Sequence, residues 1–421
     1  MRKILIILLV SVSSQAFCLS IHCGYLLDVN TGKMLSNMYV EEQDGVFTAV
    51  GSYQQQTVDI DLPDNYCVPG LIDMHTHLSS EFNKNSYSDK FQLNEADYAF
   101  KSALFAKRTL SAGFTTVRDL GDVFNVTIAL RKAISQGTVQ GPRIYTAGKS
   151  LATTGGHADP SNGYRQGLLP NPGPKNGVIN GKAEAAQAVR QRYQDGADLI
   201  KITATGGVLS QASSGDNAQF NAEELASIIA TAKDYGFKVA AHAHGKEGMK
   251  RAIIAGVASI EHGTYLDDEI IRLMKQYGTY LVPTLIAGEW VTEKSRVAGF
   301  FPQVVARKAA TIGPKIAKSF EKAHKAGVNI AFGTDSGVSA HGDNGQEFAL
   351  MVKAGMSPLK AIQAATMNAA KLLGQWQKLG SIETGKYADM VVLRENPLDN
   401  VATLENVKMV IKAGKLEFEH E

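Results

Sequence analysis

Six side chains that could bind a divalent cation stand at or near the ends of apolar, strand-like runs. His75 and His77 lie two residues apart after the run 70–74, so on a strand both imidazoles point to one face. The other four lie in or shortly after separate runs: Lys201, His242, His262 and Asp335. Each alone has an ordinary structural interpretation, such as a core histidine or a capping aspartate. Together they predict one metal site with nitrogen and oxygen ligands, which suits zinc and also manganese, iron or cobalt.

Lys201 is the unexpected member of this set. A lysine ammonium, with an ordinary pKa of ~10.4, cannot coordinate a cation and is costly to bury without a partner. Reaction with carbon dioxide would convert the amine into a carbamate, which has two anionic oxygens and can bridge two metal ions. The position of Lys201 therefore raises the hypothesis of an N6-carboxylated lysine between two ions.

The elements that must position these residues alternate between strand and helix. Amphipathic helical patterns cover residues 95–112, 182–195 and 222–235. The apolar strand-like runs cover residues 70–74, 114–118, 144–147, 199–203, 238–241, 259–261, 280–283 and 328–332. Alternating strands and helices indicate an α/β fold with a parallel sheet, and eight units predict a closed (β/α)8 TIM barrel. Such barrels carry their chemistry at the carboxyl ends of the strands.

Both chain ends differ from this pattern, being rich in short β-type segments and turns. We expect a signal peptide at residues 1–20, a first part of a β-sandwich at 21–68, the barrel at 69–375 and the second part of the sandwich at 376–421. The β-sandwich would thus be one small discontinuous domain built from both ends.

The first residues predict export. Residues 1–3 are basic at two of three positions, residues 4–12 are apolar, and small residues suited to cleavage follow at 14–16 or 18–20. The apolar run is far shorter than the ~20 residues needed to span a bilayer. We therefore expect a secreted or periplasmic protein in which Cys23 and Cys67 remain, with their pairing open. A formal net charge of +2 gives no reason to expect nucleic acid as a partner.

The run 68–77, Val-Pro-Gly-Leu-Ile-Asp-Met-His-Thr-His, resembles the first-strand metal motif of the amidohydrolase superfamily. The remaining candidate ligands follow in that family's order, and residues 380–389 are similar to its C-terminal β motif. The resemblance implies two divalent ions. It assigns the more buried ion to His75, His77 and Asp335, the outer ion to His242 and His262, and the bridge to carboxylated Lys201.

The resemblance also implies a mechanism. Two ions would share a hydroxide that attacks the scissile carbonyl, and Asp335 would take its proton and pass it to the leaving group. The chain resembles most the peptidases of this superfamily that cleave dipeptides such as Xaa-Pro and Xaa-Arg, a group related to imidazolonepropionase, through the segments 153–159, 203–210 and 333–338. The expected activity is therefore hydrolysis of the C–N amide bond of dipeptides or N-acyl amino acids.

Two other functions stay open. The same metal site could act on a cyclic amide, a lactone or a phosphotriester, whereas a non-catalytic scaffold is disfavoured by the complete ligand set. A carboxylate-binding cation near the outer metal would favour the peptidase, and a wholly apolar pocket would favour the cyclic or phosphotriester substrate.

Three residues are candidates for substrate binding. His157 follows the third strand, His244 shares a strand face with His242, and Tyr265 comes just after His262. His244 departs from several relatives, which carry tyrosine there. The expected partner is a small peptide or N-acyl amino acid, and the chain is expected to form a homo-oligomer.

Overall fold

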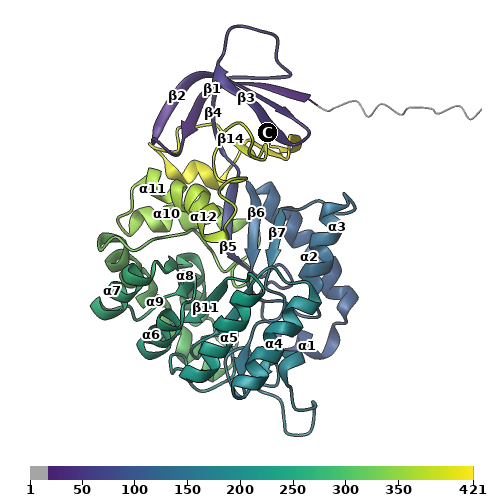
Figure 1. Ribbon diagram of the computed structural model, residues 1–421, viewed down its shortest axis with the longest axis vertical. Coiled ribbons are helices and arrows are strands. Elements are labelled where there is room, and N and C mark those ends of the chain that lie inside the picture. Colours follow the sequence, from purple (N-terminus) through teal and green to yellow (C-terminus); the bar gives the residue numbers. More distant parts are fainter. Residues whose placement is uncertain (1–17, 421) are drawn as a thin grey trace, which may run out of the picture.

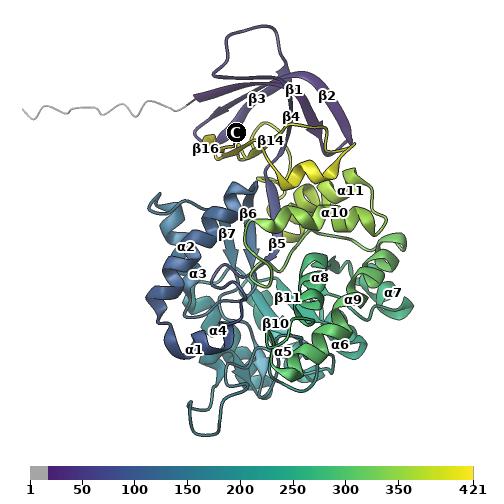
Figure 2. The same ribbon diagram turned by 180° about the vertical axis from the view of Figure 1, so that it is seen from behind.

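A computed structural model describes residues 18–420 of the chain. A barrel ringed by helices forms the larger part, and a β domain lies at one end of it in both views (Figures 1 and 2). The first and last segments of the chain, purple and yellow, meet in this β domain (Figure 1). The α/β barrel with a β domain made from both chain ends is confirmed.

Seven regular strands line the barrel, in two parallel sheets. They are β5 (Leu71–Thr76), β6 (Phe114–Asp119), β7 (Arg143–Thr146), β10 (Ile200–Thr203), β11 (Val239–Ala243), β12 (Ser259–His262) and β13 (Tyr280–Val282). Two short strands, β8 (Ala152–Thr153) and β9 (Val178–Ile179), pair outside these sheets. Between β7 and β10 the gap is closed at Leu151, whose N–H donates to the Lys201 carbonyl at 2.8 Å.

The eighth expected run, 328–332, closes the barrel without forming a regular strand. Ile330 makes a single parallel bridge to Leu281, and Met74 N–H donates to the Phe332 carbonyl at 2.9 Å. The N–H of Phe332 instead donates to Ala364, on the surrounding helices, at 3.0 Å. Because the backbone turns its donor away from the neighbouring strands here, the ladder is interrupted.

Twelve α-helices occur within residues 18–420, and most of them cover the outside of the barrel. They are α1 (Ser86–Gln92), α2 (Glu95–Ser111), α3 (Val126–Ser135), α4 (Lys182–Asp195), α5 (Ala222–Asp234), α6 (Lys246–Ala255), α7 (Asp268–Tyr277), α8 (Leu285–Lys294), α9 (Gln303–Lys325), α10 (Gln346–Lys353), α11 (Pro358–Gln363) and α12 (Ala369–Leu373). Helix α5 begins at a capping box, in which Asn221 accepts from Glu224 N–H and Glu224 accepts from Asn221 N–H. A π-helical turn at Ala364–Asn368 separates α11 from α12.

The β domain is one seven-stranded sheet in the order β16-β15-β14-β4-β1-β2-β3. Its strands are β1 (Cys18–Asp28), β2 (Lys33–Gln43), β3 (Val46–Ser52), β4 (Ile60–Pro69), β14 (Met390–Leu393), β15 (Met409–Lys412) and β16 (Lys415–Glu419). The sheet folds over an apolar core of its own, and β3 reaches the C-terminal segment through a bridge between Val46 and Tyr387.

Two features tie this domain together. Cys23 and Cys67, whose pairing the sequence left open, form a disulfide between β1 and β4. Strand β4 continues into barrel strand β5 through Gly70, where a Cβ would lie 2.3 Å from Thr115 Oγ1 and 2.7 Å from Asp389 Cβ. Only glycine allows this close approach, so β5 is anchored to the β domain immediately before His75.

Among residues 18–420, no helix is both long and apolar enough to cross a membrane.

Candidate metal and active site

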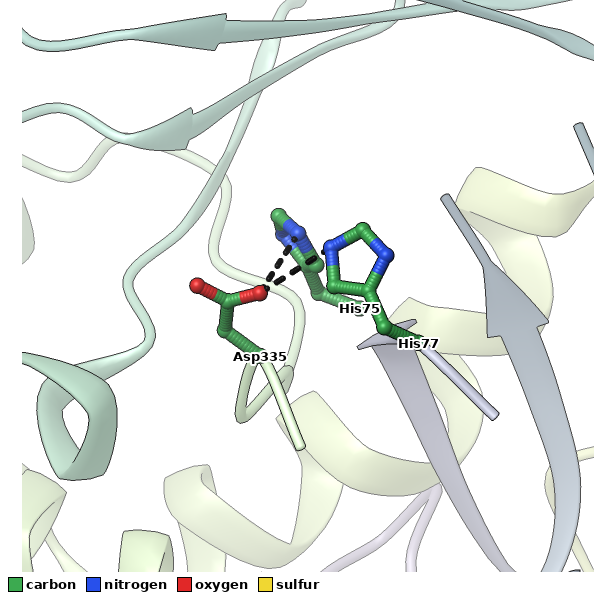
Figure 3. A group of neighbouring side chains, drawn as sticks. All are labelled: His75, His77 and Asp335. Carbon is green, nitrogen blue, oxygen red and sulfur yellow. Dashed lines mark ion pairs between the residues drawn. The ribbon is translucent and has the colours of Figure 1, made fainter. Parts of the chain in front are cut away.

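The inner part of the site lies at the end of β5. His75 and His77 both turn their Nε2 atoms to Asp335, each 3.2 Å from its Oδ1 (Figure 3). One ligand atom from each of the three lies within 4.8 Å of the others, an arrangement that could hold a metal ion. Asp335 has a φ of +60°, in the left-handed region, and its N–H donates to the His75 carbonyl at 2.7 Å. A non-glycine residue held in this way at a strand end is typical of functional sites.

The four candidate histidine ligands share one feature: one ring nitrogen of each has a hydrogen-bond partner that is not itself one of the six candidate ligands. The partners are Glu261 Oε2 for His75 Nδ1 at 3.0 Å, the Gly121 carbonyl for His77 Nδ1 at 2.8 Å, the Gly206 carbonyl for His242 Nε2 at 3.0 Å and Thr284 Oγ1 for His262 Nδ1 at 2.7 Å. A carbonyl or an ionised carboxylate can only accept, so in three of the four cases the ring nitrogen must donate. When that nitrogen donates, a neutral imidazole carries its lone pair on the other nitrogen, which is the state that a metal ligand needs.

The outer histidines and Lys201 lie beside this inner group. The His242 and His262 ring centroids are 4.8 Å apart, and His262 is 5.1 Å from His75. Lys201 Nζ lies 3.4 Å from His75 Nε2. The structure therefore brings all six predicted ligands to one cavity of about 260 Å³.

The electrostatics of the site favour anionic Asp335 and an easily deprotonated Lys201. Burial opposes ionisation of Asp335, but His75 and His77 outweigh it and hold its pKa well below the usual range. Burial lowers the pKa of Lys201 to about 8, although Glu261 and Asp335 act in the opposite direction. At a pH near 7.5 this raises the neutral fraction of the amine on the order of 10²-fold.

Two of the three expected substrate-binding residues line the cavity. The His157 ring stacks on His242 at 4.4 Å between centroids, and its Nδ1 has no hydrogen-bond partner within residues 18–420. His244 Nδ1 lies 2.6 Å from Thr264 Oγ1, and its ring is 4.6 Å from His242. Burial lowers the pKa of both His157 and His244 to about 3, so both rings are neutral donors at neutral pH.

Tyr265 is the third expected contact, and the structure does not bring it to the cavity. Among residues 18–420, the lining of the cavity does not include Tyr265. Its hydroxyl accepts a hydrogen bond from Lys315 Nζ at 3.3 Å, and the same ammonium lies 4.7 Å from its ring centroid. Tyr265 therefore lies against Lys315 on α9.

An apolar wall forms the side of the cavity away from the polar cluster. Its side chains come from the loop after β5, the loop after β10, helices α8 and α9, and the segment after Asp335: Phe82, Val208, Leu209, Ala287, Val291, Ile312, Ile316 and Val338. Within residues 18–420, no arginine lines the cavity, and Lys201 is the one lysine that does. A bulky apolar group fits this wall, whereas a basic side chain would find no acidic partner there except Asp335.

Lys308 on α9 shapes part of this wall, although no motif or spacing in the sequence points to it. Its ammonium donates to the carbonyls of Gly207, Ser210 and Ala212 at 2.8, 2.7 and 2.7 Å. All three hydrogens of the ammonium are used, so Lys308 fixes the loop that carries Val208 and Leu209 rather than contacting a substrate.

Arg118 and Glu261 also belong to the surroundings of the site, and they were not selected from the sequence. Both are buried inside the barrel, and Arg118 Nη2 donates to Glu261 Oε1 at 2.9 Å. Each stands at the end of an expected strand run, so the available signal was a charged residue in a buried strand. Burial opposes ionisation of Glu261, but Arg118 and His75 outweigh it and hold its pKa at about 2.

Comparisons with known proteins agree with this architecture. Residues 66–416 match the Amidohydrolase family. A Xaa-Pro dipeptidase whose crystal structure has methionine bound in the active site is 49% identical, with a TM-score of 0.93 over 96% of this chain and 100% of that one. A prolidase complexed with N-methylphosphonate-L-proline is 30% identical, with a TM-score of 0.87 over 96% of this chain and 100% of that one.

A third relative is the ochratoxinase of Aspergillus niger. It is 32% identical over 437 residues, which cover 97% of this chain and 88% of the relative. The peptidase group expected from the sequence is confirmed by these relatives. The chain therefore belongs to the amidohydrolase family, and it is a hydrolytic enzyme that acts on amide carbon–nitrogen bonds.

Proposed function

We propose that this enzyme uses two divalent metal ions to cleave dipeptides or N-acyl amino acids that carry an apolar side chain. The observation that carries the proposal is the convergence of four histidines on Asp335 and Lys201 in one cavity, each histidine with one ring nitrogen held by a partner that is not itself a candidate ligand. This donor set fits hard to borderline divalent ions, and zinc is the proposed metal because nitrogen and carboxylate ligands without cysteine suit it.

In the proposed arrangement His75, His77 and Asp335 would hold the inner ion, and His242 and His262 would hold the outer ion. Lys201, as an N6-carboxylated lysine, would supply oxygen ligands to both. The lowered pKa of Lys201 supports this step, because only the neutral amine reacts with carbon dioxide. The bound ions would lower the pKa of a water and polarise the scissile carbonyl.

The protein's own groups would carry the rest of the reaction. Asp335 is anionic and faces the inner histidines, so it can accept the proton of the attacking water and give it to the leaving amine. His157 has an unpartnered Nδ1 in the cavity wall. As a neutral imidazole it can rotate or shift to donate an N–H to the substrate carbonyl or carboxylate, and His244 is the second candidate donor.

The choice of substrate rests on the cavity wall and on the relatives. The wall is apolar along α8 and α9, which suits an aliphatic or aromatic side chain and disfavours a Xaa-Arg dipeptide. A relative described as a Xaa-Pro dipeptidase with bound methionine, and a relative described as ochratoxinase, support an amino-acid amide as the substrate class.

A second candidate is a neutral cyclic amide or lactone at the same metal site. It is favoured by one observation: within residues 18–420 no arginine, and no lysine except Lys201, lines the cavity to pair with a substrate carboxylate. Under the first proposal the N–H groups of His157 and His244 must serve that purpose instead.

One experiment separates these functions. Protein dialysed against a chelator is assayed with and without added zinc on a panel of Xaa-Met, Xaa-Phe, Xaa-Pro and Xaa-Arg dipeptides, N-acetyl amino acids, and matched cyclic amides and lactones. We expect zinc-restored cleavage of dipeptides with apolar C-terminal residues. Cleavage of the cyclic substrates alone would favour the second candidate, and the absence of zinc-restored hydrolysis on every substrate would refute both.

We also propose export to the periplasm or medium, with cleavage after Ala16 rather than after Ser20. The Ser20 N–H and hydroxyl both donate to Asp59 Oδ2, at 2.8 and 2.7 Å, so cleavage after residue 20 would remove the start of β1 and these contacts. The disulfide between Cys23 and Cys67 supports an oxidising compartment. Intact-mass analysis of protein recovered from the periplasm tests the site: a mature chain that begins at residue 21 would contradict it.

We propose a homo-oligomer as the working assembly. Phe91 on α1 and Phe100 on α2 are 64% and 79% exposed, which is unusual for phenylalanine and supports contact with another copy of the chain. Light scattering coupled to gel filtration tests this, and a mass of one chain would refute it.

A further inference from the structure

A buried carboxylate, that of Glu261, lies behind the inner metal-binding group. Glu261 lies on β12 with no exposed surface, and its Oε2 accepts the hydrogen bond from His75 Nδ1 at 3.0 Å. Its other oxygen, Oε1, accepts from Arg118 Nη2 at 2.9 Å and from the Ser259 hydroxyl. Both oxygens are therefore engaged, and the direction of the carboxylate is fixed from two sides.

Arg118 holds this carboxylate from across the barrel. It is 2% exposed, and its Nε donates to the Met74 carbonyl at 2.7 Å while Nη1 donates to Ser259 Oγ at 3.0 Å. A guanidinium is planar and rigid, so contacts to β5 and β12 leave it little freedom to move. Among residues 18–420, the cavity lining includes neither Arg118 nor Glu261, so this pair is not placed to contact a substrate.

His75 differs in this respect from the other three candidate ligands. His77 and His242 donate to backbone carbonyls, and His262 is partnered by a threonine hydroxyl, all of which are neutral. Only His75 has a charged acceptor on the ring nitrogen that points away from the candidate metal site. A charge-assisted hydrogen bond is stronger than a neutral one, and a carboxylate partner makes an imidazole a more basic ligand.

We propose that Glu261, held by Arg118, is a positioning residue that keeps His75 in the tautomer with a free Nε2 and thereby strengthens binding of the inner metal ion. This inference rests on the metal site of the proposed function. The alternative is that the pair only stabilises the barrel. A buried ion pair that loses one partner leaves an uncompensated charge, so loss of activity in a single variant would not separate the two roles.

Replacement of Glu261 by glutamine separates them because an amide has one acceptor and one donor group. In Glu261→Gln, charged Arg118 takes the amide oxygen, so the amide NH₂ group faces His75 Nδ1. That donor stabilises the opposite tautomer, in which Nε2 carries the hydrogen and cannot bind a metal. In the double variant Glu261→Gln with Arg118→Met, the amide oxygen is free to accept from His75 again. A purely structural role predicts no such recovery of metal affinity.

The test measures metal affinity, not turnover. Chelator-stripped protein is titrated with zinc against a chromophoric chelator, the visible spectrum of the cobalt(II) form is recorded, and urea unfolding of the metal-free protein reports the fold. We expect Glu261→Gln to weaken the binding of one of the two ions about 100-fold, and the double variant about tenfold. Glu224→Gln is the matched control, since Glu224 is a buried carboxylate that accepts from Gly181 and Asn221 N–H and is not part of the cavity lining within residues 18–420.

Each outcome decides a different point. If the unaltered protein binds no zinc, the proposed metal site is wrong. If the unaltered protein binds two ions and folded Glu261→Gln binds both with the same affinity, the role of Glu261 is wrong and the proposed function stands. If Glu261→Gln does not fold, the double variant decides, because it removes both charges: unchanged affinity there overturns the inference, and a tenfold loss with an altered cobalt spectrum supports it.

Discussion

The close approach of Gly207 to the His157 ring allows a direct test of the role of His157 in substrate binding. A Cβ at this position would lie 2.3 Å from His157 Cε1 and 2.4 Å from both ring nitrogens, whereas carbon atoms in contact lie about 3.5–4.0 Å apart. The His157 ring is already stacked on His242. Gly207→Ala must therefore displace the ring by roughly 1 Å, while the Gly207 backbone itself is not in the left-handed region that would exclude alanine.

The size of the effect follows from this displacement. A misplacement of about 1 Å in a group that orients a substrate can cost on the order of 10²-fold in rate, or about 3 kcal/mol of transition-state stabilisation. We therefore expect Gly207→Ala to lower kcat/KM on an apolar dipeptide by about 100-fold. Urea unfolding should change little, because a single methyl group meets one movable side chain.

The assay is a double-mutant cycle with His157→Ala. If alanine at position 207 acts through His157, adding it to His157→Ala should change kcat/KM by less than about threefold. Gly173→Ala is the control, since a Cβ at this loop glycine meets nothing within 4 Å. Full activity in Gly207→Ala, or additive losses in the double variant, would refute the steric argument and the role of His157 with it.

Three further predictions concern the metal bridge, the acid stability and the β domain. Lys201→Ala should reduce the metal content from two ions to one or fewer per chain by mass spectrometry, with partial recovery in propionate; two retained ions would contradict a bridging carbamate. Burial lowers the pKa of His341 to about 4, below its value near 6.5 in the unfolded chain, so the folded protein binds fewer protons than the unfolded chain between these two pH values. The free energy of unfolding should therefore fall by roughly 1 kcal/mol per pH unit as the pH falls through this window. His341→Gln should reduce this pH dependence in urea unfolding, and an unchanged pH dependence would contradict the prediction. Replacing Cys23 and Cys67 by alanine should lower the free energy of unfolding by roughly 2–4 kcal/mol, because the disulfide joins residues that are 44 positions apart. The value of kcat/KM should stay the same. An unchanged unfolding midpoint would show that the bond does not form.

Much of the architecture could be predicted because its signals are local. Apolar runs bounded by polar residues predicted β5, β6 and β10 to β13, and the helix at 182–195 coincides with α4. The six candidate ligands could be found for the same reason, since each lies in or shortly after an apolar strand-like run and a parallel barrel gathers strand ends in one place.

What could not be predicted depends on contacts between distant segments. Glu261 and Arg118 are 143 residues apart, and nothing local to either run shows that their side chains meet inside the barrel. The irregular closure at Phe332 depends on a donor–acceptor pair with Ala364, which a strand pattern does not encode. Tyr265 was selected only because it follows His262, and sequence proximity did not bring it into the cavity.

The place of β4 in the sheet has a consequence for biosynthesis. On one side β4 pairs with β1, and on the other with β14, where Pro69 faces Met390, a residue that is synthesised about 320 residues later. During translation, β4 therefore exposes one unpaired edge until β14, which follows the whole barrel in sequence, has been synthesised. An open strand edge invites pairing with other chains. Chains truncated before β14 should thus aggregate through β4, because pairing with Met390–Leu393 is what closes this edge.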